Sequence, residues 1–175
     1  MNAPTNGTDA KETLIQTPRL YLRPFSKEDE QKAASLLCNE AFMAFSPTGA
    51  LNINQARVRF AQILKSYEKN GIGKFAVIEE SSKYLIGYCG IESCEIDGES
   101  HLELGFRLCV NYRGLGYATE AASAVLRYAM AQGIEKVIAF TEPGNQASIN
   151  VLQKLGFRAY RKSFFSDMPV VLFMK

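Results

Sequence analysis

The sequence contains no tryptophan, one histidine and four cysteines that form no CxxC pair. A single histidine, His101, cannot complete the Cys/His ligand sets typical of zinc sites, so the sequence predicts no metal centre. We interpret the cysteines as reduced thiols of a cytoplasmic protein.

Long apolar runs and an excess of one charge are also absent. No stretch approaches the roughly 20 apolar residues of a membrane-spanning helix, and the start MNAPTNGTDAKE lacks the basic and apolar regions of a signal peptide. Twenty Lys and Arg against 18 Asp and Glu leave a net charge of +2, which indicates neither a nucleic-acid nor a membrane partner. We expect a disordered leader at 1–13 and one domain at 14–175, either a monomer or a homodimer.

The first part of this domain is expected to hold one strand and two helices. The segment TPRLYLRPF alternates apolar and polar residues, which predicts a strand. Ser26, followed by Asp29 three residues later, resembles a helix cap, and a helix is expected from about 27 to 40. A second helix, with apolar residues at helical spacing, is expected to end at Asn70-Gly71.

Three apolar segments then predict an antiparallel meander. They are KFAVIEE, YLIGYCGIESCEI and HLELGFRLCV, separated by turns at SSK and Asp97-Gly98. Alternation in the last segment divides it into two faces. One face carries Leu102, Leu104, Phe106, Leu108 and Val110, and the other carries His101, Glu103, Gly105, Arg107 and Cys109.

The last part of the chain predicts helices at about 117–131 and up to about 155, and strands at KVIAFTE, near 157–164 and near 169–174. Gly114 and Gly116 lie between the meander and the first of these helices. Such a loop lets main-chain N–H groups approach an anion, although the glycines could equally serve a tight turn. The Walker motif is absent, and a GxGxxG fingerprint fails because Thr119 replaces its third glycine.

Arg113, Gly116 and Ala118 fit the pattern [RQ]xxGx[GA], which resembles the acetyl-CoA signature of the GNAT acetyltransferases. ELGFRLCVNYRGLGYATEA resembles the central strand, loop and helix of that superfamily, and NQASINVLQKLGF resembles its following helix. TPRLYLRPF resembles the start of the ribosomal-protein N-acetyltransferase subgroup. The resemblance covers roughly residues 14–162.

This resemblance implies a single-domain α+β fold with a mixed, mostly antiparallel twisted sheet of about seven strands and about four helices. Its fourth and fifth strands should splay apart to admit the pantetheine of acetyl-CoA. The matching positions imply that acetyl-CoA contacts Leu108, Cys109, Val110, Arg113, Gly114, Leu115, Gly116, Tyr117, Ala118, Thr119 and Asn145. Asn145 could alternatively, or in addition, cap a helix.

The resemblance also implies catalytic roles. Glu103 matches the position of a catalytic glutamate in some members, with an ion pair to Arg107 as the structural alternative. His101 could substitute for Glu103 but is expected to be exposed. Leu152 stands where many members carry the tyrosine that protonates the thiolate, so Ser148 is the candidate acid, with water or Tyr117 as alternatives.

The implied function is acetyl-CoA-dependent acetylation of a primary amine by direct transfer, without a covalent intermediate on Cys109. Subgroup resemblance favours a protein N-terminal α-amine. A small-molecule amine acceptor such as a polyamine, amino acid or antibiotic, and a non-catalytic acyl-CoA sensor, are the alternatives. Phe42 and Phe45 either line the acceptor pocket or cover the core.

Overall fold

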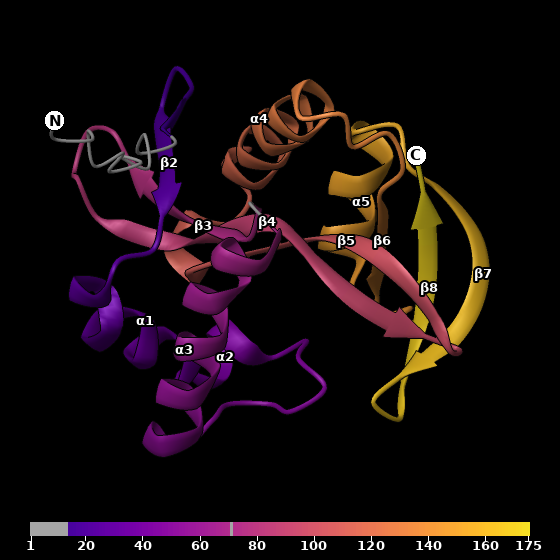
Figure 1. Cartoon of the computed structure of the whole chain (residues 1–175), viewed down its shortest axis with the longest axis horizontal. Coiled ribbons are helices and arrows are strands. Elements are labelled where there is room, and N and C mark those ends of the chain that lie inside the picture. Colours follow the sequence, from indigo (N-terminus) through magenta and orange to yellow (C-terminus); the bar gives the residue numbers. More distant parts are fainter. Residues whose placement is uncertain (1–13, 71) are drawn as a thin grey trace, which may run out of the picture.

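Residues 14–70 and 72–175, with the side chains of 68–70 excepted, are described by a computed structural model and form one eight-stranded sheet of order β1-β2-β3-β4-β5-β6-β8-β7 (Figure 1). The expected leader at 1–13 lies outside the described residues. The strands are β1 (Ile15–Gln16), β2 (Leu20–Pro24), β3 (Lys74–Glu79), β4 (Leu85–Ile96), β5 (Glu99–Leu108), β6 (Ile138–Thr141), β7 (Arg158–Phe165) and β8 (Met168–Met174).

Five α-helices lie in the same described ranges, with short 3₁₀ turns at Lys27–Asp29 and Val110–Tyr112. They are α1 (Glu30–Leu37), α2 (Glu40–Met43), α3 (Ile53–Asn70), α4 (Tyr117–Ala131) and α5 (Gln146–Lys154). The sheet therefore has one strand more, and the fold one helix more, than the approximate numbers expected. The additions β1 and α2 are too short to show a hydrophobic period.

The expected helix at 27–40 is wrong in its extent. Ser26 and Asp29 do form the cap, since the Ser26 N–H donates to the Asp29 carboxylate at 2.9 Å. However, α1 ends at Leu37, and Asn39 accepts a hydrogen bond from the Phe42 N–H at 2.8 Å, which caps α2 as a separate helix.

The predicted meander is confirmed, because β3, β4 and β5 pair antiparallel in chain order. β4 and β5 pair without a register shift from Ile96↔Glu99 to Gly87↔Leu108. The predicted faces of β5 therefore hold along the paired length: Leu104 and Leu108 point into the main core, and Glu103 points to the opposite face.

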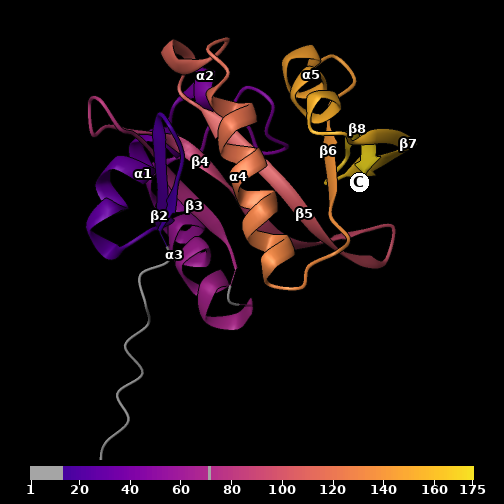
Figure 2. The same ribbon diagram turned by 90° about the horizontal axis from the view of Figure 1, so that it is seen from above.

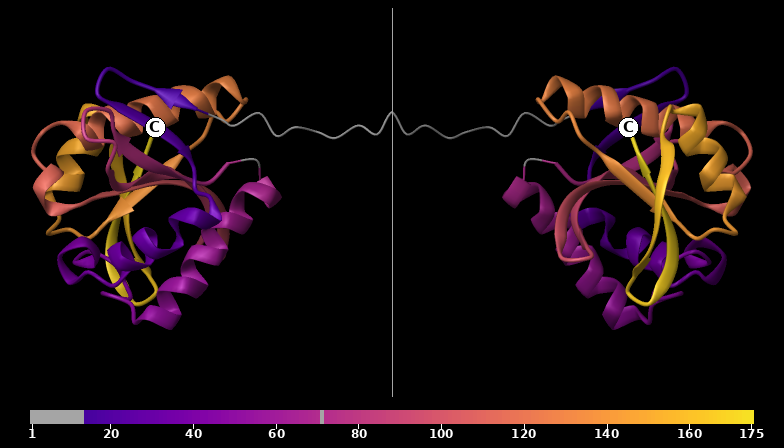
Figure 3. Two further views of the ribbon diagram at one scale, coloured as in Figure 1. Left: turned by 90° about the vertical axis from the view of Figure 1, so that its left-hand side faces the viewer. Right: turned by 90° about the vertical axis from the view of Figure 1, so that its right-hand side faces the viewer.

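Helices cover both faces of the sheet (Figures 2 and 3). On β3, Phe75 and Val77 belong to the core cluster beneath α4, whereas Ala76 and Ile78 pack against residues of α1 and α3. The predicted apolar stripe of α4 is confirmed, since its residues Ala121, Val125, Leu126 and Ala129 are all buried. This central helix fixes the position of the loop that precedes it.

The sheet is split between β5 and β6, as expected for the fourth and fifth principal strands. Within the described residues, these parallel strands pair at one position, Glu103↔Ile138, and β6 continues as the partner of β8. Residues 104–108 of β5 consequently present an open main-chain edge.

Candidate active site

A cleft of about 1450 Å³ follows the open edge of β5. All residues from Leu104 to Leu108 line it, so both faces of the strand border the same space. The N-terminal ends of α4 and α5 lie on one side of the cleft, and α3 and the segment between α2 and α3 lie on the other.

The glycine loop presents free main-chain N–H groups at the start of α4. Gly114 and Gly116 have φ of +77° and +84°, a conformation that L side chains rarely adopt. The main-chain N–H groups from 114 to 119 have no acceptor among the described residues, and the first helical bond is donated by Glu120 to the Gly116 carbonyl. Free N–H groups at a helix N-terminus favour phosphate.

Arg19, which sequence analysis did not select, stabilises this loop through side-chain contacts. Its guanidinium donates to the Leu115 carbonyl at 3.0 Å and to the Glu120 carboxylate at 2.7 Å, and lies 4.4 Å from the ring centroid of Tyr117. The Tyr117 hydroxyl donates to the Glu79 carboxylate at 2.6 Å. Tyr117 therefore supports the loop from the protein side, and its hydroxyl is engaged away from the cleft.

Two arginines connect α2 and the segment after it to β5 and the loop that follows β5. Arg113 donates to the carbonyls of Leu108 at 2.9 Å and Ala41 at 2.8 Å. Arg107 contacts the Met43 sulfur at 2.9 Å and donates to the Phe45 carbonyl at 3.4 Å. The position of α2 is thus set by side chains that originate on β5 and the loop after it.

Phe42 and Phe45 both line the cleft, and they differ in burial. Phe42 is buried and packs edge-on against Tyr88, whereas Phe45 is exposed. Phe42 therefore both lines the cleft and covers the core.

Asn145 and Ser148 lie at the start of α5. The buried Asn145 side chain accepts a hydrogen bond from the Ser148 N–H at 3.2 Å, which confirms its role as a helix cap. Both residues also line the cleft. Leu152, one turn later, is 1% exposed and belongs to the main core cluster.

Glu103 is paired with a lysine that sequence analysis missed. Its carboxylate lies 3.0 Å from the Lys74 ammonium, which is also 3.8 Å from Glu92, and Glu92 in turn pairs with Arg59 at 2.8 Å. Burial works to lower the pKa of Lys74, but the carboxylates of Glu103 and Glu92 outweigh it and raise the pKa above its usual value. The proposed alternative partner, Arg107, instead contacts α2 and the segment after it.

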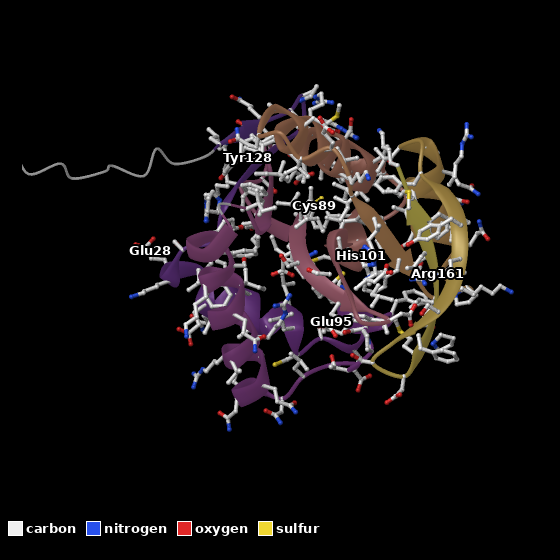
Figure 4. All side chains as sticks on the ribbon, turned by 45° about the vertical axis from the view of Figure 1, so that its right-hand side comes forward. Glu28, Cys89, Glu95, His101, Tyr128 and Arg161 are labelled. Carbon is white, nitrogen blue, oxygen red and sulfur yellow. The ribbon has the colours of Figure 1, made fainter. Side chains whose placement is uncertain are left out.

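His101, Cys94 and Cys109 are partly buried. His101 was therefore wrongly expected to be exposed; the β4–β5 hairpin that carries it is joined to β7 by the ion pair of Asp97 with Arg161 at 3.0 Å, and His101 and Arg161 are labelled in Figure 4. Burial raises the pKa of the Cys94 thiol to about 11 and also raises the pKa of the Cys109 thiol above its usual value. These thiols are therefore protonated at neutral pH and are poor nucleophiles.

Most of the predicted site residues meet at the cleft. Those that line it are Glu103, Leu108, Arg113, Gly114, Gly116, Ala118, Thr119, Asn145 and Ser148. Cys109, Val110, Leu115 and Tyr117 are not among the lining residues of the described chain. Within the described residues, no His, Cys, Asp and Glu cluster could hold a metal ion, and no helix is long and apolar enough to cross a membrane.

Comparison with known proteins identifies the family to which the chain is similar. Residues 19–158 match the family model described as "Acetyltransferase (GNAT) domain". The uncharacterized N-acetyltransferase YnaD of Bacillus subtilis is 31% identical over 152 residues, which is 86% of this chain and 85% of YnaD.

Solved structures share the fold. A GNAT-family acetyltransferase structure from Bordetella pertussis superposes with a TM-score of 0.82 at 21% identity, covering 93% of this chain and 99% of that one. RimL, described as a ribosomal L7/L12 α-N-protein acetyltransferase and solved with coenzyme A, superposes with a TM-score of 0.78 at 14% identity, over 93% and 97% of the two chains.

Proposed function

This chain belongs to the GNAT acetyltransferase family and is an acyltransferase, and on that premise we propose that it transfers the acetyl group of acetyl-CoA to the α-amine of a protein N-terminus. The observation that carries the proposal is the run of free main-chain N–H groups at 114–119. These groups lie beside the open edge of β5, and the Glu103 carboxylate lines the same cleft.

The cleft suits acetyl-CoA in both shape and chemistry. Diphosphate takes the N–H groups between Arg113 and Thr119, where the helix dipole favours negative charge. Pantetheine reaches the β5 edge at Leu108 and pairs with it as an added strand does, whereas Cys109 and Val110, which were expected beside it, do not line the cleft. The Asn145 amide N–H groups, which have no acceptor among the described residues, are available to a pantetheine carbonyl. The thioester then lies near Ser148.

Transfer proceeds by direct attack of a neutral amine on the thioester carbonyl carbon. The N–C bond forms and the C–S bond breaks, the amine loses a proton to Glu103 through a water molecule, and the coenzyme A thiolate gains a proton from Ser148 or solvent. Holding both reactants together can lower the barrier by about 7–11 kcal/mol. No covalent enzyme intermediate is required.

The free energy needed to neutralise the amine favours an α-amine as the acceptor. Neutralising a lysine side chain at pH 7 costs about 4.6 kcal/mol, whereas an α-amine with a pKa near 8 costs about 1.4 kcal/mol. The α-amine needs the smaller free energy of deprotonation, so it is the better match for a carboxylate base such as Glu103. The α-N-protein activity named for RimL agrees with this choice.

A panel of acceptors tests the proposal. The purified protein is incubated with acetyl-CoA and either peptides with free N-termini, the same peptides blocked at the N-terminus but containing lysine, or small amines. We expect thiol release and the added mass of one acetyl group with the free N-termini. Acetylation of small amines alone would refute the choice of acceptor, and tight acetyl-CoA binding without thiol release would indicate a sensor.

Replacing the proposed base tests the role of Glu103. Glu103→Gln should lower kcat about 10²-fold at neutral pH, and the loss should shrink at higher pH as the amine deprotonates on its own. Glu95→Gln is the matched control, since Glu95 also lines the cleft from β4 and is exposed. Equal kcat for Glu103→Gln and wild type across the pH range would make Glu103 purely structural.

A further inference from the structure

Lys74, Gly90 and Gly105 form a row across three neighbouring strands. Lys74 on β3 pairs with Gly90 on β4, which pairs with Gly105 on β5. All three positions lie on the face of the sheet that also carries Glu92 and Glu103. The Lys74 side chain reaches across both glycines to the Glu103 carboxylate on β5.

Gly105 makes room for the Lys74 side chain, and Gly90 makes room for the main chain of Gly73 and Lys74 on the neighbouring strand. A Cβ on Gly105 would lie 2.3 Å from the Lys74 Nζ and 2.8 Å from a Glu103 carboxylate oxygen. A Cβ on Gly90 would lie 2.6 Å from the Lys74 Cα and 2.0 Å from the Gly73 carbonyl oxygen. Neither glycine has a positive φ. Their lack of a side chain therefore serves close approach, and the lysine path is built into the strands.

The ammonium at the end of this path is fully engaged. The Lys74 side chain is 5% exposed, and its Nζ donates to Glu103 at 3.0 Å and to the Gly90 carbonyl at 3.4 Å. Burying a charged pair gives little net stability, because desolvation offsets the attraction between the charges. A sheet interior that keeps a lysine over two glycines therefore points to a role other than stability.

We propose that Lys74 is a positioning residue, which holds the Glu103 carboxylate oriented toward the acceptor amine. The inference rests on the proposed function, in which Glu103 accepts the amine proton. Among the described residues, Lys74 makes the one ion pair of Glu103. Lys74 acts through Glu103 and does not itself touch the substrates.

Other titratable groups surround the pair from each neighbouring element. Glu92 on β4 is the second acceptor near Lys74, and its charge is balanced by Arg59 from α3. Burial raises the pKa of the Cys94 and Cys89 thiols on β4, so both are neutral near pH 7. The phenols of Tyr88 on β4 and Tyr67 on α3 also lie in the vicinity, and the Tyr67 hydroxyl donates to the Lys74 carbonyl. Lys74 is therefore the charged group that pairs with Glu103, whereas the charge of Glu92 is balanced by Arg59.

A double-mutant comparison tests whether Lys74 acts through Glu103. kcat, KM and the acetyl-CoA Kd are measured against pH for Lys74→Met, Glu103→Gln and the double variant. We expect Lys74→Met to lower kcat at neutral pH and to leave both KM and Kd unchanged, since the carboxylate loses its partner while the binding surfaces stay in place. In the double variant, Lys74→Met should lower kcat no further than Glu103→Gln alone.

Two further variants complete the test. Gly105→Ala keeps both charged groups but displaces the ammonium, so it should reproduce the kcat loss in the wild-type background and not in the Glu103→Gln background, even if Lys74→Met does not fold. Lys32→Met, on the exposed face of α1, should match wild type. An equal loss from Lys74→Met or Gly105→Ala with and without Glu103 overturns the proposal for Lys74, whereas full activity of Glu103→Gln overturns the proposed base itself.

Discussion

A single substitution at Gly116 should change both the stability of the protein and its affinity for acetyl-CoA, and the two effects can be measured separately. Its φ is +84°, and a Cβ there would lie 3.3 Å from the Arg19 guanidinium. Placing valine in this left-handed conformation costs roughly 1–2 kcal/mol. For a protein of this size, the corresponding fall in Tm is about 2–8 °C, at about 2–4 °C per kcal/mol.

The strained conformation and the contact with Arg19 should also displace the loop, so that its N–H groups no longer converge on the diphosphate. A lost hydrogen bond to a charged group is worth about 1.5–3 kcal/mol, and each 1.4 kcal/mol is about tenfold in Kd, so Gly116→Val should weaken acetyl-CoA binding at least about tenfold. Titration calorimetry measures Kd, and thermal unfolding measures Tm.

Gly98→Val provides the matched control for the Gly116 substitution. Gly98 lies in the β4–β5 turn with φ of +76°, and a Cβ there would meet no heavy atom within 4 Å. It should show the same fall in Tm with an unchanged Kd. If Gly116→Val binds acetyl-CoA as tightly as Gly98→Val does, the diphosphate does not bind at this loop.

Two further predictions concern stability. Burial works to raise the pKa of Asp29, but hydrogen bonds from Arg23 and Ser26 outweigh it and hold the pKa below its usual value. The stability that this carboxylate contributes is therefore present above about pH 4 and is lost as the pH falls through the lowered pKa. Arg23→Gln should lower the urea midpoint of unfolding at neutral pH. In the variant, the midpoint should also fall less steeply than in wild type as the pH is lowered. Leu152→Tyr should lower stability by about 1–3 kcal/mol through overpacking, measured by urea unfolding, and an unchanged midpoint would show that the cleft accommodates the ring.

The parts of the fold that were predictable are those with a sustained period. α4 matches its expected bounds of 117–131 because alanine and aliphatic residues recur along fifteen positions and Gly133 stops the helix with φ of +81°. β5 matches because its alternation continues unbroken to the loop. In contrast, α2 has four residues, and Asn39, which separates it from α1, gives only a local signal.

The candidate site was predictable where main-chain conformation carries it and less so where distant side chains meet. The glycines of the loop can be read directly from the sequence, whereas the contact of Arg19 with Glu120 joins positions about a hundred residues apart. Lys74 was missed because it begins an apolar strand and its partner lies two strands away. Gly90 and Gly105, isolated inside predicted strands, were the signal that the main chain is closely approached there.

The single main-chain pair between β5 and β6 has a mechanical consequence. Within the described residues, strands β1–β5 and strands β6–β8 are joined by one main-chain pair, Glu103↔Ile138, and by side-chain packing in the main core. Acetyl-CoA bound between β5 and β6 would contact both groups of strands, so its binding should also oppose their separation, by about 2.7 kcal/mol at a hundredfold excess over Kd.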